Sequence, residues 1–312
     1  MKIIALDANA LTFDGLSWFQ IQELGEFTAY EKSSPQEGIK RSKDAEAVIV
    51  NKFLINKEFI ANCPKLKYVG ITATGTNNVD LKLCAESGIV VTNVPEYSSL
   101  SVAQLVFSYI CYHYNRLGDY QKLSSQWHES KNFCLPLPEH IELSALSICI
   151  VGQGAIGKKV AQIAKAFEMK ILTPAIPGRS YSEQRVSLKQ AFQDAEVITL
   201  HCPLSEHTDK IINEENLSVM KSNAILINTA RGGLIDEQAL VSALQSKKLA
   251  AAYLDVLSKE PPEENHPLVN NAFVTPHIAW ATVEARARLM QETALNLKAF
   301  LSTERRNILS AL

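Results

Sequence analysis

The chain has 312 residues, of which 46% are hydrophobic, and its formal net charge is −2. A chain of this length is expected to form about two domains, whose cores need no disulfide bridges. The balance of 31 basic and 33 acidic residues argues against a protein that binds nucleic acid or an anionic membrane surface.

The cysteines and the N-terminus point to a location in the cell. None of the six cysteines forms a CxxC pair and several lie in apolar runs, which favours buried, reduced thiols. The apolar run before Asp7 is too short for a signal-peptide core, and no apolar stretch approaches the ~20 residues of a membrane helix. A cytoplasmic protein is therefore expected.

The first part of the chain alternates between strand-like and helix-like segments. Strands are predicted at 2–6, 27–30, 47–50, 66–71 and 89–93. Helical or polar segments lie between them at 15–25, 35–43, 56–63 and 78–87. This alternation predicts an α/β fold in which helices cover a parallel sheet.

The second part repeats this alternation with more apolar strands. They are predicted at 145–152, 169–173, 196–202, 223–230, 251–256 and 272–276, and such runs suit strands buried on both faces. The segment 156–167 has the apolar stripe of an amphipathic helix. The spacing predicts a complete doubly wound domain.

Two long helices, 99–123 and 282–302, are predicted to join the two parts. The second is expected to return to the first part. The predicted domains are therefore one of residues 1–99 plus 284–312 and an inserted one of residues 100–283; the glycine motif of the inserted domain and a family resemblance, both given below, predict that it binds NAD(P) and that the other domain binds the substrate. A ligand cleft is expected between the two lobes, at the carboxyl ends of the strands.

The stretch VGQGAIG has the GxGxxG spacing of a dinucleotide-binding turn, with Gly152, Gly154 and Gly157. It follows a predicted strand and opens a predicted helix, which is the context that this motif requires. The three glycines then serve the tight turn, the close approach of the pyrophosphate and the packing of helix on strand. The alternative is a tight turn that binds nothing.

The next strand lacks the acidic residue that usually binds the adenosine ribose of NAD. Thr173, Pro174 and Ala175 occupy its end, and Glu168 comes too early. Arg179 follows with Ser180, and an arginine here commonly receives the 2′-phosphate of NADP. The sequence slightly favours NADP over NAD, although Arg179 also fits an ordinary solvated loop.

Three further residues, Arg231, Glu260 and His277, each follow a predicted strand of the second part. Because the carboxyl ends of parallel strands meet at one edge, they are expected to converge. The arginine suits a substrate carboxylate, and the histidine a proton transfer to oxygen. The glutamate would fix the imidazole and raise its pKa. The alternatives are a structural ion pair, a surface acid and a core histidine.

At these residues the sequence resembles the D-isomer-specific 2-hydroxyacid dehydrogenases over essentially the whole chain. The likeness is strongest in VGQGAIGKKVA, ILINTARGGLIDEQAL, LDVLSKEPP and TPHIAWAT. Within the family, ATGTNNVDL and SSQWHESKNFC are most similar to glycerate dehydrogenases (hydroxypyruvate reductases). The main departure is Ala175, where NAD-preferring relatives carry an acid.

The resemblance implies a flavodoxin-like substrate domain, a homodimer formed through the nucleotide domain, and roles for particular residues. Arg231, Glu260 and His277 would be catalytic. The candidate substrate-binding residues are Thr74, Gly75 and Thr76 of a carboxylate-binding loop, Arg231 and His277, with Asn51 and Trp280 added from their positions; plain loop and core roles fit these two equally well. The candidate cofactor-binding residues are Gly152, Gln153, Gly154, Ala155, Ile156, Arg179, His201, Cys202, Pro203, Thr208, Thr229, Ala230 and Asp255.

The sequence as a whole predicts an oxidoreductase that transfers a hydride between NAD(P)H and the keto carbon of a small 2-keto acid. Reduction of hydroxypyruvate or glyoxylate is favoured, with His277 as proton donor. No metal is expected, because the adjacent His201 and Cys202 lack further ligands at zinc spacing. Reduction of pyruvate or a branched keto acid is one alternative, and a nucleotide-sensing regulatory protein on the same scaffold is another.

Overall fold

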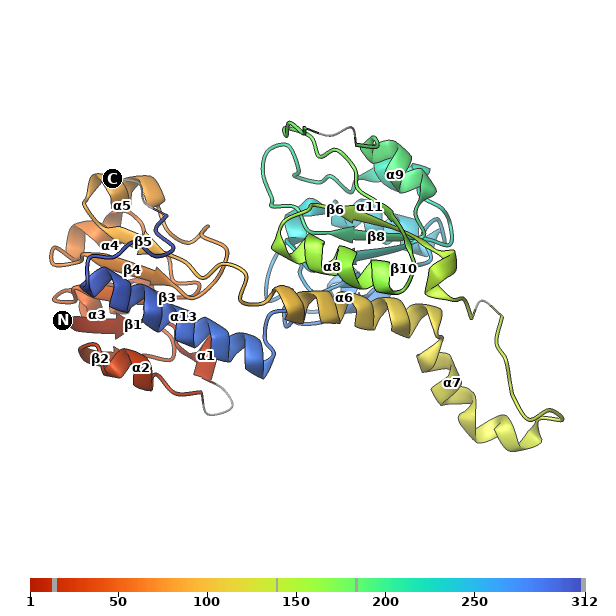
Figure 1. Cartoon of the computed structure of the whole chain (residues 1–312), viewed down its shortest axis with the longest axis horizontal. Helices are drawn as coiled ribbons and strands as arrows, with labels where there is room; N and C mark the ends of the chain where they lie inside the picture. The colour runs from red at the N-terminus through yellow and green to blue at the C-terminus, as the bar shows by residue number, and fades with distance from the viewer. Residues whose placement is uncertain (13–15, 139, 183–184, 310–312) are drawn as a thin grey trace. The chain divides into compact units, whose positions relative to one another are not determined.

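The computed structural model describes residues 1–312 apart from 13–15, 139, 183–184 and 310–312. The chain divides into two compact units, Met1–Ser98 with Ala281–Leu312 and Ser99–Trp280. The predicted boundaries fall after residues 99 and 283, and the observed ones after Ser98 and Trp280. Each unit has its own parallel sheet flanked by helices (Figure 1).

The first unit is built on a sheet with the strand order β2-β1-β3-β4-β5, in which all neighbours are parallel. This order is the flavodoxin-like one, as the family resemblance implied. The strands are β1 (Lys2–Ala5), β2 (Glu26–Ala29), β3 (Ala47–Val50), β4 (Tyr68–Ile71) and β5 (Val90–Thr92). The helices are α1 (Asn9–Thr12), α2 (Phe19–Gln22), α3 (Pro35–Ser42), α4 (Lys57–Asn62), α5 (Leu81–Glu86) and α13 (Val283–Leu301).

The last helix, α13, belongs to this first unit although it follows the second unit in the chain. It begins at Thr282, whose side chain accepts a hydrogen bond from the N–H of Ala285. Its Phe300 ring lies 5.0 Å from the ring of Tyr68 on β4. Asn296 donates to the carbonyl of Asn93 at 2.8 Å. These contacts fix α13 on the face of the first sheet.

The second unit has a parallel sheet with the order β11-β10-β9-β8-β6-β7. The strands are β6 (Ser147–Val151), β7 (Lys170–Leu172), β8 (Val197–Leu200), β9 (Ile225–Asn228), β10 (Ala251–Leu254) and β11 (Phe273–Val274). The helices are α6 (Ser99–Tyr114), α7 (Leu117–Leu123), α8 (Ala155–Ala166), α9 (Leu188–Asp194), α10 (Glu214–Val219), α11 (Glu237–Gln245) and α12 (Pro267–Asn271), with 3₁₀ turns η1 (Ser124–Glu129), η2 (Leu143–Ala145) and η3 (Gly232–Leu234).

Alternate residues of the central strands enter two separate cores. On β6, Cys149 and Val151 pack towards the face that carries α9, α10, α11 and α12. Ile148 and Ile150 pack towards the face that carries α6 and α8. Burial on both faces explains the nearly continuous apolar runs of these strands. The strand order reverses between β6 and β8, which is where doubly wound sheets bind ligands.

The predicted helix over 99–123 is two helices, because the chain breaks between α6 and α7. Arg116 adopts a left-handed backbone with φ 54°. Its guanidinium donates to the Asp119 carboxylate at 2.7 Å and to the Pro138 carbonyl at 2.8 Å, which holds the break. Beyond it, α7, η1 and residues 130–138 form an arm that leads away from the sheet (Figure 1).

The cysteines are mostly buried, as expected, but Cys134 of the arm is exposed and Cys111 is half-buried. None of the helices in the described part of the chain is both long and apolar enough to cross a membrane.

Candidate active site

The glycine-rich turn between β6 and α8 is as tight as its sequence suggests. Gly152 has φ 116°, and a Cβ there would lie 2.6 Å from the backbone of His201. A Cβ at Gly157 would lie 1.9 Å from the carbonyl oxygen of Gly152, so the helix packs directly on the turn. Gly154, by contrast, faces open space. The N-terminus of α8 is therefore accessible to an anionic group such as a diphosphate.

A second feature of this edge also fits a bound nucleotide. The hydroxyl of Thr229, which directly follows β9, is buried and has no hydrogen-bond partner among the described residues. Buried polar groups are nearly always satisfied, so an unpartnered one at the carboxyl edge of a sheet suits a ligand. Together with the open Gly154, it shows that the residues present fit a dinucleotide such as NAD(P).

Residues 173–180, which directly follow β7, include no carboxylate. Gln153 of the glycine turn donates to the Thr173 hydroxyl at 3.4 Å, so neutral groups face each other at the place of the usual acid. Further on, a Cβ at Gly178 would touch the His207 ring at 2.1 Å, so this segment packs on the loop after β8. Arg179 lies near enough for its charge to lower the pKa of Cys202, although burial has the larger effect and raises it to about 11.

The loop after β8 is held mainly by its own hydrogen bonds. Thr208 donates to the Pro203 carbonyl at 2.7 Å and accepts from the N–H of Ser205 at 2.8 Å, so its hydroxyl is used within the loop. The ring of His201 bonds to the Thr199 hydroxyl at 2.9 Å, and burial lowers its pKa to about 3. His201 is therefore uncharged at neutral pH. Its backbone, rather than its ring, lies against Gly152.

The acid and the histidine predicted from the sequence form a pair. His277 Nδ1 lies 2.6 Å from Glu260 Oε2, and the other carboxylate oxygen accepts the N–H of Leu257 at 3.1 Å. Because a carboxylate only accepts hydrogen bonds, Nδ1 carries the proton and Nε2 is free to face a substrate. The two side chains are about one-third exposed, at 28% and 35%.

Arg231 lies in a turn that packs against the segment leading to Glu260. Asn228 at the end of β9 donates to the Arg231 carbonyl at 2.8 Å and accepts the N–H of Ala230 at 3.0 Å. A Cβ at Gly232 would lie 2.0 Å from the backbone of Leu257, so the two loops are in close contact. The Arg231 guanidinium donates to the Ala230 carbonyl at 2.7 Å, which leaves further N–H groups for an anion.

Asp255, which directly follows β10, is buried beneath the histidine loop. Its carboxylate accepts hydrogen bonds from Thr275 at 2.5 Å and from the N–H groups of Ile278 and Ala279 at 2.9 Å each. Burial raises its pKa, and these bonds and the nearby His277 lower it. The Asp255 carboxylate thus holds the segment that carries His277. The cofactor contact that the resemblance implies for Asp255 stays a prediction.

The other residues that were predicted to bind substrate differ in whether their hydrogen-bond donors are already used within the protein. After β4, the N–H groups of Gly75 and Thr76 donate to no acceptor among the residues that the structure describes. The side-chain amide of Asn51 instead donates to the carbonyl and the hydroxyl of Thr72, at 2.7 and 3.2 Å. Trp280, the last residue of the second unit, is half-buried.

Sequence reasoning missed several residues that shape these edges. Asp7 accepts the N–H groups of Asn51, Lys52 and Phe53 at 2.5–2.8 Å and so fixes the loop after β3. A lone aspartate after a strand gives no signal of this role. Thr275 and Tyr109 act on the histidine loop and were also missed, because they meet only in the folded chain.

A flavodoxin-like unit, a Rossmann-type unit with an open glycine turn, and an Arg–Glu–His set at one sheet edge define the class of nicotinamide-dependent oxidoreductases of small acids. Residues 109–279 match the family described as D-isomer specific 2-hydroxyacid dehydrogenase, NAD binding domain. The chain belongs to this family and is one of its enzymes.

Similar proteins agree with this assignment. A hydroxypyruvate reductase of Blautia hydrogenotrophica is 37% identical, with 99% of this chain and 100% of the relative covered. A solved acyclic imino acid reductase in complex with NADPH and D-Arg is 31% identical, with a TM-score of 0.85 over 99% of this chain and 100% of that one. A D-lactate dehydrogenase of Aquifex aeolicus complexed with NAD and lactic acid is 26% identical, with a TM-score of 0.84 over the full length of both chains.

Proposed function

We propose that the protein reduces a small 2-keto acid, hydroxypyruvate or glyoxylate, to D-glycerate or glycolate with NAD(P)H. The observation that carries this proposal is the His277–Glu260 hydrogen bond of 2.6 Å at the edge that also carries Arg231. A proton donor next to a carboxylate-binding cation is what reduction of a keto acid requires. The similarity to a hydroxypyruvate reductase supports this choice of substrate.

Arg231 binds the substrate carboxylate through its remaining N–H groups. The resemblance assigns carboxylate binding to Gly75 and Thr76 as well, and their N–H groups donate to no acceptor among the described residues. A bound reduced nicotinamide supplies the hydride for the keto carbon. His277 then gives the proton on Nε2 to the developing alkoxide, and the product is the 2-hydroxy acid.

Glu260 serves His277 in two ways. It holds the ring through Nδ1, which leaves Nε2 for the substrate, and its negative charge stabilises the imidazolium that must be present before proton transfer. Because Glu260 also accepts the N–H of Leu257, the carboxylate cannot rotate freely away from the ring. Glu260 therefore acts as the partner of the acid and not as a second acid.

The proposed cofactor is NAD(P), with a slight preference for NADP over NAD. Residues 173–180 directly after β7 include no carboxylate that could bind the 2′-hydroxyl of NAD or repel a 2′-phosphate. The charge of Arg179 lowers the pKa of the Cys202 thiol, so Arg179 lies near the loop that follows β8. Solved relatives contain NADPH in one case and NAD in another, and thus support either cofactor.

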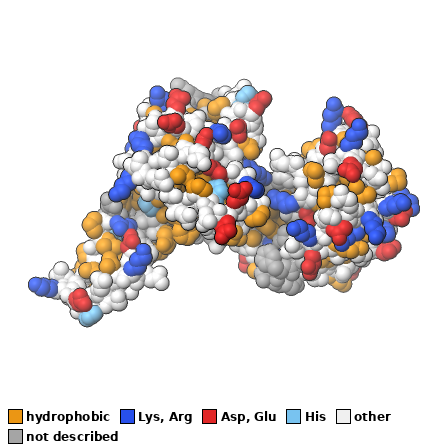
Figure 2. All heavy atoms as spheres, turned by 180° about the vertical axis from the view of Figure 1, so that it is seen from behind, with side chains coloured by type: hydrophobic (Ala, Val, Ile, Leu, Met, Phe, Trp, Pro, Cys, Tyr) orange, Lys and Arg blue, Asp and Glu red, His pale blue; other side chains and the backbone are white. Residues whose placement is uncertain are grey.

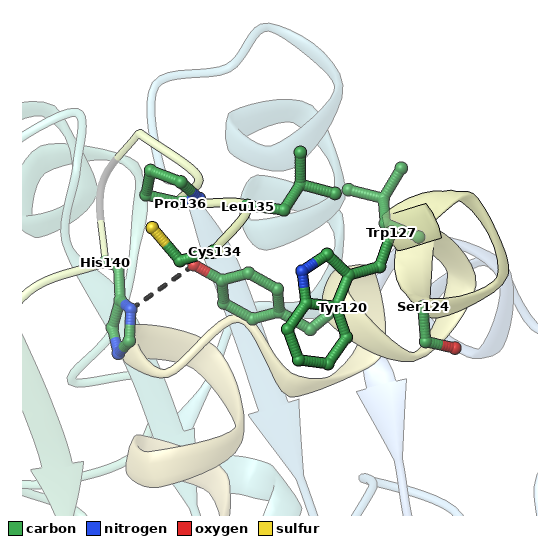
Figure 3. Close-up of a pocket in the computed structure, with 8 residues that line it drawn as sticks. Tyr120, Ser124, Trp127, Cys134, Leu135, Pro136 and His140 are labelled. Atoms are coloured by element: carbon green, nitrogen blue, oxygen red, sulfur yellow. Dashed lines mark hydrogen bonds between the residues drawn. The ribbon is translucent and has the colours of Figure 1, made fainter. Parts of the chain in front are cut away.

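The protein is also proposed to act as a cytoplasmic homodimer, in which the arm contacts a second copy of the chain. Trp127 and Phe133 on the arm are 55% and 91% exposed, and Figure 2 shows hydrophobic side chains along it. Tyr120, Trp127, Leu135 and Pro136 line an apolar pocket of about 460 Å³ at the arm (Figure 3). Exposed apolar surface of this kind marks an interaction site.

The direct test is a steady-state assay of hydroxypyruvate and glyoxylate, each with NADH and NADPH. Pyruvate and a branched keto acid complete the panel, because they are the alternative substrates. We expect the highest kcat/KM with hydroxypyruvate or glyoxylate. A clear preference for pyruvate or a branched acid would replace the proposed substrate. Nucleotide binding without turnover of any acid would favour a regulatory protein on the same scaffold.

A further inference from the structure

The loop that carries His277 is held from below by groups that no step of the proposed reaction uses. It runs from Thr275, directly after β11, to Ala279. Helix α6 contacts this loop at both ends. Tyr109 hydrogen-bonds to the Thr275 hydroxyl at 2.6 Å, and Ser101, two turns earlier on the helix, donates to the Ala279 carbonyl at 2.5 Å.

The direction of the bonds at Thr275 follows from chemistry. The Asp255 carboxylate can only accept, so the Thr275 hydroxyl donates its single proton to it. The Thr275 oxygen must then accept the bond from Tyr109. Tyr109 has a proton to give, because burial raises its pKa to about 12. The result is an ordered relay from the Tyr109 hydroxyl through Thr275 to Asp255.

The relay ends where the backbone of the loop needs support. His277 has φ 55°, a left-handed conformation that a non-glycine residue adopts only at some cost. Its N–H donates to the carbonyls of Asp255 and Thr275 at 2.9 Å each. The Asp255 carboxylate takes the next two N–H groups, those of Ile278 and Ala279. Asp255 therefore binds the loop on both sides of the strained residue.

We propose that Tyr109, Thr275 and Ser101 are positioning residues, which act through Asp255 and the loop backbone to hold His277 in its left-handed conformation. They touch neither the proposed substrate nor the proton that His277 transfers. Their effect is on the placement of Nε2, and small displacements of a reacting group cost much of the rate. This inference rests on the proposed function for its kinetic readout.

The first test compares Thr275→Val, which keeps the shape but removes the hydroxyl, with Thr275→Ser, which keeps the hydroxyl. Loss of a hydrogen bond to a charged group predicts that Thr275→Val lowers kcat about tenfold. The KM for NAD(P)H is expected to stay unchanged, since the loop does not hold the glycine turn. Thr275→Ser is expected to restore most of kcat.

The second test asks whether Tyr109 acts through Thr275. Tyr109→Phe alone is expected to lower kcat about threefold, since it removes one neutral hydrogen bond. Added to Thr275→Val, it is expected to lower kcat no further, because the relay is already broken. Tyr253→Phe is the matched control. Tyr253 lies on β10, and its hydroxyl hydrogen-bonds to His113 of α6, the helix that also carries Tyr109, at 3.0 Å. No hydrogen bond joins Tyr253 to the histidine loop among the described residues, so kcat is expected to stay at the wild-type value.

A readout without turnover separates this inference from the proposed function. In protein labelled at the histidine rings, the NMR signal of His277 is identified as the one of seven that His277→Gln removes. We expect it to shift in Thr275→Val and Tyr109→Phe but not in Tyr253→Phe. An unchanged signal, unchanged kcat in both variants, or multiplying effects in the double variant would overturn the inference. Absent turnover in the wild-type protein would overturn the proposed function alone.

Discussion

Several contacts of the second unit hold the single residue His277 in place. Its ring is bonded to Glu260, while its backbone is left-handed and supported by Asp255. We expect His277→Ala to lower kcat by about 10²–10⁴, since a positioned general acid contributes that much. The dissociation constant for NAD(P)H, measured by nucleotide fluorescence, is expected to remain near the wild-type value. His128→Ala removes another His–Glu pair, Nε2 to Glu129 at 3.7 Å on the exposed arm, and is the control. Normal kcat in His277→Ala would remove the acid from the proposal.

Ala175 and Arg179 carry the prediction on cofactor choice. Ala175→Asp places a carboxylate after β7, where it bonds a ribose hydroxyl and repels a 2′-phosphate. The ratio of kcat/KM for NADPH over NADH is expected to fall about tenfold or more, the effect of one charge-assisted contact. Arg179→Ala is expected to weaken NADPH use and leave NADH use nearly unchanged. A ratio that stays constant in both variants would contradict this account of the strand end.

At the scale of elements, two glycines at the junction of β6 and α8 have different roles: Gly157 allows close packing of the helix, and Gly154 leaves space for a ligand. Gly157→Ala forces a Cβ to within 1.9 Å of the Gly152 carbonyl, so the helix must shift. We expect it to cost about 1–3 kcal/mol of unfolding free energy, as overpacking does, and to weaken NAD(P)H binding. Gly154→Ala meets no atom within 4 Å and is the matched partner. It is expected to weaken NAD(P)H binding with an unchanged Tm, measured in the same titration and melting experiments.

The elements also show what the sequence can and cannot predict. Strand positions follow from apolar runs, and the glycine turn follows from its spacing, because both signals are local. The break at Arg116 was not predicted, since its left-handed backbone depends on bonds to Asp119 and Pro138. The Tyr109–Thr275 bond joins residues 166 positions apart, and no local pattern indicates such a pair. The placement of the catalytic candidates after strands was predictable, but the groups that support them were not.

At the scale of the whole molecule, the arm carries the prediction on assembly. Phe133→Asp places a charge on an exposed aromatic position, and Trp127→Asp does so within the arm pocket. Burying an unpaired charge costs several kcal/mol, so the dimer is expected to dissociate at micromolar concentration. Sedimentation or light scattering would give the mass. Leu54→Asp, at an exposed position of the first unit, is the control and is expected to leave the mass unchanged. A wild-type protein that is monomeric would contradict the proposed dimer.

The division of the chain has a consequence for how such enzymes diversify. The glycine turn, the proposed acid and its partner, and the helix beneath them all lie between Ser99 and Trp280. The flavodoxin-like unit, made from both ends of the chain, contributes none of these groups. Substitutions in that unit therefore alter none of the residues of the His277–Glu260 pair or of the glycine turn. Each of the two units can thus accumulate sequence changes while the residues proposed for proton transfer and nucleotide binding stay the same.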